Sequence, residues 1–238
     1  MIGRQKKKRG SGCYIVRLIK NLKLKMKNLV LIVILSYLIG AIPIGVIISR
    51  LYKGIDIRDY GSKNAGATNV YRVLGPIPAG IVLFLDAFKG MVAVLFISQI
   101  SFGAPLTNEI ALKIIAGISA VLGHIFPIYV GFKGGKGIAA GLGVLLALIP
   151  REVLIALGLF ILILALTRYV SLGSLSAATF ISLALIFEKY YLHKEVEKEL
   201  IILCVALTFL IFFTHRSNIK RLWNGTENKF GQKDKRID

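Results

Sequence analysis

One polar stretch between apolar runs carries the side chains of an anion-binding loop. Residues 61–72 read GSKNAGATNVYR. Glycines let the backbone approach an anion, hydroxyl and amide groups can donate hydrogen bonds to it, and the guanidinium of Arg72 suits a two-point contact with phosphate. The same residue types are common in solvated turns, so composition alone leaves both interpretations open. The candidate residues in this stretch are Gly61, Ser62, Asn64, Gly66, Thr68, Asn69 and Arg72.

A second polar stretch, residues 123–137, leads directly into an apolar run and reads GHIFPIYVGFKGGKG. Free N–H groups at a helix N-terminus with a lysine beside them favour an anion. The spacing of a nucleotide-binding P-loop is absent, because Val130 stands where a glycine is needed and Gly137 where Ser or Thr should follow Lys136. The candidate residues in this second stretch are Gly134, Gly135, Lys136 and Gly137.

Three ionisable residues interrupt apolar runs. Asp86 and Lys89 stand three residues apart, a helical spacing that predicts an ion pair within the membrane. His124 lies beside Pro127 at membrane depth, where both a functional role and a packing role stay open.

Two later polar segments also combine cations with small hydroxyl or amide groups. Arg168, Ser171 and Ser174 lie in one, and His215 and Asn218 in the other. No histidine is followed by aspartate at the fifth position, the pair that many acyltransferases with soluble donors use, and no carboxylate cluster suggests a divalent metal site. We therefore expect a site that surrounds a phosphate-bearing substrate and works through cations, hydrogen bonds and proximity.

The elements that must position these loops are membrane spans. The chain has 238 residues, 55% of them apolar, with 31 Lys or Arg against 12 Asp or Glu and a formal charge of +19. Uncharged apolar runs of about 20 residues exclude a disordered polyelectrolyte and indicate an all-α integral membrane protein with one membrane domain. The expected spans are 29–48, 79–100, 110–130, 138–150, 153–167, 172–187 and 199–214, of which the fourth and fifth are short.

Basic residues set the expected orientation. The connections after the first, third, fifth and seventh spans hold 15 Lys or Arg, whereas the opposite side holds five. The positive-inside rule then places the first loop and the C-terminus in the cytoplasm and the start of the first span outside.

The basic N-terminal stretch contradicts this orientation, since residues 1–27 hold ten Lys or Arg and no acid. A start at Met26 would resolve the conflict and lower the net charge to +10. We therefore expect residues 1–25 to be a basic extension that the native protein lacks or does not need, 26–231 to be the membrane domain and 232–238 a polar tail. Cys13 and Cys204 lie in the extension and in an apolar run, with no spacing typical of a disulfide framework or metal site.

Taken together, the motifs resemble the bacterial PlsY family of acyl-phosphate:glycerol-3-phosphate acyltransferases. The similar segments are GSKNAGATNVYRVLG (61–75), LDAFKG (85–90), GHIFPIYVGFKGGKGIA (123–139), RYVSLGS (168–174) and HRSNIKRLWNGTE (215–227). Their order matches the family across residues 26–231. Lys63 and Ala65 depart from the pattern, where members often have Gly and Ile, and neither residue is assigned to the chemistry.

The resemblance implies a seven-helix enzyme of the bacterial cytoplasmic membrane whose site faces the cytoplasm. It implies transfer of a fatty acyl group from acyl phosphate to the 1-hydroxyl of glycerol 3-phosphate, which yields lysophosphatidic acid and phosphate, the first step of phospholipid synthesis. The two substrates and membrane lipids are its expected partners, with no cofactor, metal, nucleic acid or obligate protein partner. The implied catalytic residues are Ser62, Arg72, Lys136, Ser171, His215 and Asn218, and the implied substrate-binding residues are Gly61, Asn64, Gly66, Thr68, Asn69, Gly134, Gly135, Gly137 and Glu227.

Two other functions stay open. Short or broken helices with their N-termini aimed at an anion are also features of small-anion transporters, although no inverted repeat is visible and the polar motifs gather on one side. An acyltransferase that uses acyl-CoA or acyl carrier protein is the second alternative.

Overall fold

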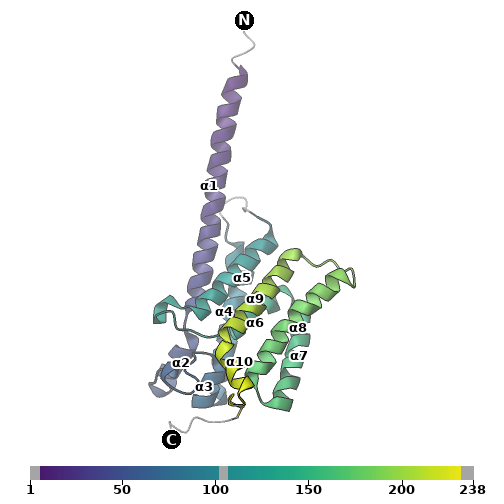
Figure 1. Ribbon diagram of the computed structural model, residues 1–238. Coiled ribbons are helices and arrows are strands. Elements are labelled where there is room, and N and C mark those ends of the chain that lie inside the picture. The colour runs from purple at the N-terminus through teal and green to yellow at the C-terminus, as the bar shows by residue number, and fades with distance from the viewer. Residues whose placement is uncertain (1–5, 102–106, 232–238) are drawn as a thin grey trace.

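The chain folds into a bundle of helices (Figure 1). The computed structural model describes residues 6–101 and 107–231, and for residues 6–18 the backbone alone. All regular elements in these ranges are helical, as the sequence predicts. The expected polar tail at 232–238 and the side chain of Cys13 lie outside the described part.

The first expected span, 29–48, is not one continuous helix. Helix α1 (Lys6–Ala41) passes through Met26 and ends before Ile42 and Pro43, and α2 (Ile44–Lys53) begins directly after the proline. Proline lacks the N–H that would continue the α1 ladder, so the chain breaks there. Residues 29–48 nevertheless lie within one apolar segment, Ile19–Lys53, that is long enough to cross a membrane.

The remaining helices follow the predicted apolar runs closely. Helix α3 (Ala67–Leu74) and the 3-10 turns η1 (Ile57–Asp59), η2 (Ile97–Gln99) and η3 (Ile128–Val130) lie in the connections. The longer elements are α4 (Pro76–Leu95), α5 (Glu109–Ile125), α6 (Ile138–Leu148), α7 (Pro150–Thr167), α8 (Val170–Tyr190) and α9 (Lys198–Thr214), followed by the short α10 (Arg216–Trp223).

Five helical segments of the described chain are long and apolar enough to cross a membrane, and α9 with α10, bent by 62°, makes a sixth. Helix α6 has 11 residues. That is about 16 Å of helix against a hydrocarbon core of about 30 Å. The five or six segments are Ile19–Lys53, Pro76–Gln99, Glu109–Val130, Pro150–Thr167, Val170–Tyr190 and the bent pair.

Close packing against α4 supports the short α6. A Cβ on Gly143 would overlap the carbonyl of Ala87, and one on Gly90 would overlap the carbonyl of Ala140, so the two helices approach at backbone distance. In the largest core cluster, Val144 of α6 is joined by buried aliphatic side chains of α5, α7, α8 and α9, namely Val121, Val153, Leu185 and Leu203.

Helices α2, α3 and α10 lie at the end of the bundle opposite the start of α1 (Figure 1). The predicted polar motifs on and beside these helices therefore lie at this end of the bundle.

Candidate active site

A cavity of about 480 Å³ brings the predicted site residues together. All six expected catalytic residues border it, although their motifs are far apart in the sequence. Six of the nine expected binding residues also border it, with Glu227 among them. These lining residues are Ser62, Asn64, Gly66, Thr68, Asn69, Arg72, Lys136, Gly137, Ser171, His215, Asn218 and Glu227, whereas Gly61, Gly134 and Gly135 are not among them.

The cavity also has an apolar part between the helices. Along α7 the lining extends from Leu164 near the polar end to Val153. At 1.5 Å per residue this is about 16 Å of helix, roughly half the thickness of the hydrocarbon core. The buried end is closed by aliphatic side chains of four helices, Leu145, Val153, Ala156, Ile181 and Leu207.

A buried carboxylate organises the polar end. Glu227 Oε1 accepts hydrogen bonds from Ser171 Oγ at 2.9 Å and from Asn218 Nδ2 at 2.6 Å. Glu227 Oε2 accepts one from Arg221 Nε at 2.7 Å. An acceptor-only anion with these partners orients donors and would repel phosphate. Glu227 thus anchors the groups around it, and its expected part in substrate binding stays a prediction.

Sequence reasoning missed Arg221 as a site residue. It borders the main cavity and also a smaller adjoining one of about 210 Å³. The available signal was its place between Asn218 and Glu227 in the last motif, where it is a cation in the same segment as two assigned residues.

The segment that carries Glu227 is fixed against α3 and against the turn between α7 and α8. Phe230 N donates to the Arg168 carbonyl at 2.6 Å, and Arg168 Nη2 donates to the Phe230 carbonyl at 3.1 Å. The rings of Tyr71 and Phe230 stack with centroids 4.4 Å apart. Arg168 thus holds the C-terminal segment in the position that places Glu227 at the cavity.

Lys136 is the central cation of the polar end. Its Nζ donates to Asn218 Oδ1, and Thr214 Oγ1 donates to the Lys136 carbonyl at 3.1 Å. Burial lowers the pKa of Lys136 to about 8, against the opposing effect of Glu227 and with Arg221 adding to the decrease. Near neutral pH the ammonium is mostly charged but poorly hydrated, a state that favours contact with phosphate oxygens.

The smaller cavity extends this polar end. Ser62, Asn64, Lys136 and Arg221 border both cavities. Lys63 and Arg216 border the smaller one, so several cations face a volume suited to a small polar molecule.

His215 stands at the bend between α9 and α10 with a defined ring orientation. Its Nδ1 lies 2.9 Å from the Ile211 carbonyl. A carbonyl oxygen only accepts, so Nδ1 donates and the neutral ring carries its lone pair on Nε2. The imidazole can therefore accept a hydrogen bond or a proton at Nε2.

Two residues of the first loop shape its backbone. Asn69 is 1% exposed, and its Nδ2 lies within 3.0 Å of the carbonyls of Ile57, Tyr60 and Asn64. Its Oδ1 accepts from Ser62 N at 2.7 Å. Gly61 has φ +58° and packs against this amide. The Asn69 amide is used by the loop, although Asn69 borders the cavity, and Gly61 is not among the lining residues. Their expected part in substrate binding stays a prediction.

Asn64 and Gly66 form the turn before α3. Asn64 Oδ1 accepts from Gly66 N at 2.9 Å, which fixes the entry to the helix. Gly66 and Thr68 then border the cavity at the first turn of α3.

The glycines before Lys136 also differ from expectation. Gly134 N donates to the Ile125 carbonyl at 3.2 Å and Gly135 N to the His124 carbonyl at 3.0 Å. The sequence suggested that these amides are free to bind an anion. In the structure both donate to carbonyls of the preceding segment instead. Gly137, with φ +87°, is the N-cap of α6 and does border the cavity.

Within the described residues, no group of three His, Cys, Asp or Glu side chains is arranged to hold a metal ion. The chemistry that the cavity offers is cationic binding of phosphate beside a long apolar groove.

Comparison with known proteins agrees with these features. A family model for glycerol-3-phosphate acyltransferase matches residues 30–225. A glycerol-3-phosphate acyltransferase of Chlorobaculum tepidum is 40% identical over 232 residues, which cover 88% of this chain and all of the relative. One from Fusobacterium nucleatum is 44% identical over 198 residues, covering 83% of this chain and 96% of the relative.

The fold is similar to solved structures as well. The crystal structure of PlsY, an integral membrane glycerol 3-phosphate acyltransferase, in its glycerol 3-phosphate form has a TM-score of 0.74 and 36% identity, covering 85% of this chain and 96% of that one. The lysophosphatidic acid form of PlsY has a TM-score of 0.71 and 35% identity, covering 86% of this chain and 96% of that one.

Proposed function

Because the chain belongs to the glycerol-3-phosphate acyltransferase family and is an integral membrane enzyme of the PlsY type, we propose that it transfers a fatty acyl group from acyl phosphate to the 1-hydroxyl of glycerol 3-phosphate. The observation that carries the proposal is the composition of one cavity. Its polar end holds Arg72, Lys136 and Arg221, enough cations for two phosphate groups, and its other end is an apolar groove at bilayer depth. An acyl chain in the groove would place its carboxyl phosphate among the cations.

The cations and hydrogen-bond donors act on the phosphate groups. Lys136 and Arg72 neutralise phosphate charge, which brings two anionic substrates together and favours the departure of phosphate. Ser62, Ser171 and Asn218 orient substrate oxygens, while Glu227 holds the latter two in place.

The reaction itself needs little activation of the donor, because an acyl phosphate is a mixed anhydride. The 1-hydroxyl oxygen bonds to the acyl carbon, the bond from that carbon to the phosphate oxygen breaks, and inorganic phosphate leaves. A phosphate oxygen of the substrate takes the hydroxyl proton, and the resulting P–OH group donates a hydrogen bond to His215 Nε2. A His215→Ala variant that still binds phosphate but loses turnover together with the normal pH profile would instead assign the proton to a protein base.

We propose seven crossings, with α6 and the bent α9–α10 pair completing the set, the start of α1 outside and the site at the cytoplasmic face of the bacterial cytoplasmic membrane. The excess of basic residues on the connections at the site's end supports this orientation. The described chain also begins and ends at opposite ends of the bundle (Figure 1). Tagging each end for accessibility in intact cells tests it.

We propose that residues 26–231 are sufficient for activity. A chain that starts at Met26 should insert and turn over like the full chain. A loss of activity on this truncation would show that the basic extension is needed.

A donor assay tests the central proposal. The purified protein in micelles is given labelled glycerol 3-phosphate with acyl phosphate, acyl-CoA or acyl carrier protein thioester. Labelled lysophosphatidic acid from acyl phosphate alone is expected. Product from a thioester alone would reassign the donor, and no product from any donor would favour anion transport, to be measured as glycerol 3-phosphate uptake into proteoliposomes.

A further inference from the structure

Three buried ionisable side chains in the helices have no part in the proposed chemistry. Asp86 and Lys89 of α4 and His124 of α5 are exposed by 1%, 5% and 7%. Lys89 Nζ lies 2.8 Å from Asp86 Oδ1, which confirms the predicted ion pair, and His124 Nδ1 lies 3.3 Å from the same oxygen. Buried ion pairs are weak evidence for stability, because apolar residues of similar volume often serve as well. Their presence in this bundle therefore calls for another role.

The first contacts of the triad Asp86, Lys89 and His124 lie at the break between α1 and α2. Lys89 Nζ donates to the Ile42 carbonyl at 2.9 Å, between α1 and α2. Close by in the sequence, Tyr37 Oη of α1 donates to the Phe126 carbonyl at the end of α5 at 2.7 Å. The triad thus connects the break in the first span with α4 and with the end of α5.

The second set of contacts reaches the loop before α6. Gly135 N donates to the His124 carbonyl at 3.0 Å. A Cβ on Gly135 would overlap the His124 ring, and one on Gly134 would overlap the His124 carbonyl, so this loop lies directly on the histidine. Lys136 is the next residue, and its own carbonyl is bound from the other side by Thr214.

From these contacts we infer that His124, held by Asp86 and Lys89, is a positioning residue that sets where Lys136 lies in the cavity. The inference rests on the proposed phosphate-binding role of Lys136. Displacement of a binding group by about 1 Å can reduce catalysis about a hundredfold. The His124 ring fixes Gly135, the residue before Lys136, and so controls substrate binding without chemistry of its own.

The test is a kinetic cycle between the ring and the glycine that covers it. His124→Ala removes the ring, and Gly135→Ala adds the methyl group that would strike it. The substrate that Lys136 holds is identified first, as the one whose KM rises in Lys136→Met. Each single change should raise that KM by about tenfold or more, with a smaller change in kcat. His124→Asn, which keeps a side-chain donor toward Asp86, should recover part of the loss.

The double variant separates positioning from general damage. Without the ring the new methyl group has space, so the combined KM should be no worse than that of the worse single variant. Independent effects would multiply instead and would overturn the inference. Gly135 is not among the glycines with left-handed φ, so alanine there is strained by the ring and not by the backbone.

Two matched controls complete the experiment. Leu112→Ala empties a buried site elsewhere on α5 and should lower the thermal midpoint without moving either KM. Gly158→Ala on α7 adds a methyl group where no atom lies within 4 Å and should change nothing.

The outcomes distinguish this inference from the proposed function. If Lys136→Met leaves both KM values unchanged, the proposed role of Lys136 is wrong. If Lys136→Met raises a KM while folded Gly135→Ala and His124→Asn do not, the positioning role alone is wrong. Should His124→Ala fail to fold, the Gly135→Ala and His124→Asn results decide the question.

Discussion

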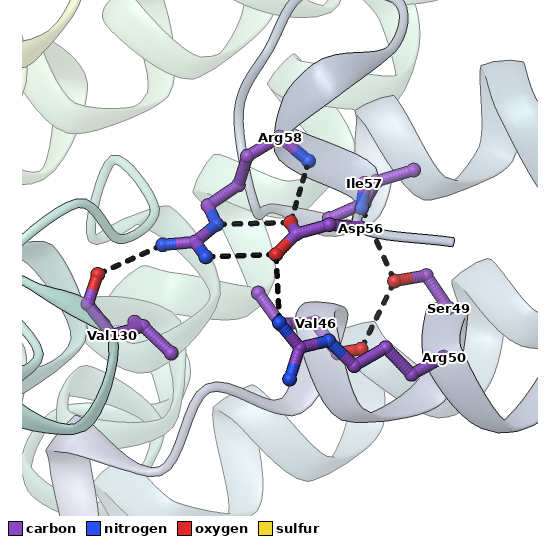
Figure 2. A network of polar contacts seen from close by, with 7 residues as sticks. All are labelled: Val46, Ser49, Arg50, Asp56, Ile57, Arg58 and Val130. Carbon is purple, nitrogen blue, oxygen red and sulfur yellow. Dashed lines mark hydrogen bonds and ion pairs between the residues drawn. The ribbon is translucent and has the colours of Figure 1, made fainter. Parts of the chain in front are cut away.

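Two carboxylates in the connections of this protein each hold an arginine, but only one of them does so at the cavity. Around Asp56 the partners are Arg58, through Nε at 2.9 Å and Nη2 at 2.8 Å, and Arg50 at 3.1 Å (Figure 2). Arg58 Nη1 also donates to the Val130 carbonyl at 2.8 Å, which ties the loop after α2 to the loop after α5. The hydrogen bonds from Arg58 hold the pKa of Asp56 well below its usual range.

Around Glu227 the donors come from separate parts of the chain. Ser171, Asn218 and Arg221 all border the cavity, and Asn218 also accepts from Lys136. Asp56 and Arg58 are not among the cavity residues.

The difference shows that one kind of pairing serves two purposes. Around Asp56 a forked arginine–carboxylate pair and a carbonyl contact order two loops. Around Glu227 the carboxylate fixes the positions of donors that border the cavity. Donors fixed in advance in this way can stabilise the charge that develops on a bound substrate. Damage to the first network should appear as lost stability, and damage to the second as lost catalysis.

The largest effect should come from Glu227→Gln. The amide can no longer accept from Ser171, Asn218 and Arg221 together, so the donors around Lys136 lose their common anchor. We expect kcat/KM to fall about a hundredfold, the range seen when a single preorganised donor is removed. Steady-state kinetics checks this, with Glu188→Gln, which breaks the exposed contact to Lys194, as the control that should stay near wild type. An equal loss in both variants would show that the fall in kcat/KM does not come from the Glu227 network.

The next effect is a dependence on pH that only the cavity network should show. The pKa of Lys136 is lowered to about 8, so the ammonium is present below that pH and lost as pH rises through it. The KM of the phosphate substrate that it binds should rise about tenfold between pH 7 and pH 9. Lys136→Arg should flatten this rise, since arginine stays charged. A wild-type KM that does not change up to pH 9 contradicts the account.

Exchange of arginine for lysine should separate the networks further. In Arg221→Lys the planar donor set is lost beside the substrate, and we expect kcat/KM to fall about fivefold to tenfold. Arg58→Lys loses the fork on Asp56 and should lower the thermal midpoint while kcat/KM stays within about twofold. Parallel kinetics and melting curves of the two variants measure both quantities. The comparison fails if Arg58→Lys is the less active enzyme.

Asp56→Asn should have the smallest effect on activity. Loss of the charged acceptor weakens contacts with Arg50 and Arg58, which is expected to destabilise the protein by about 1–2 kcal/mol. The thermal midpoint should drop by several degrees, whereas KM and kcat at a temperature below the transition stay within about twofold of wild type. A selective rise in KM would mean that the loop after α2 also takes part in substrate binding.

Much of the site was predictable because polar residues between apolar runs must lie near a membrane surface. Ser62, Arg72, Lys136, Ser171 and His215 come from four distant connections, and the cavity gathers them as expected. Residue type alone did not decide between a site and solvated turns. The recurrence of cations with hydroxyl or amide groups in several connections on one side of the membrane favoured a shared site.

Other features depend on geometry that the residue pattern does not contain. An amide such as that of Asn69 can face an anion or its own loop, and only the folded loop decides between them. The pairing of Arg221 with Glu227 depends on the bend of 62° between α9 and α10. It also depends on the segment after α10 folding back toward that helix. A proline at position 43 signals a break in a helix, but no residue pattern shows that Lys89 contacts the Ile42 carbonyl beside it.

The most direct test of the account is equilibrium binding of labelled glycerol 3-phosphate to the purified protein near pH 7, with excess inorganic phosphate as competitor. Wild-type protein and Arg58→Met should bind it saturably, and Lys136→Met should lose most of this binding while it keeps a cooperative thermal transition. Equal binding by Lys136→Met, or loss of binding in Arg58→Met alone, would place the phosphate site elsewhere and contradict the account.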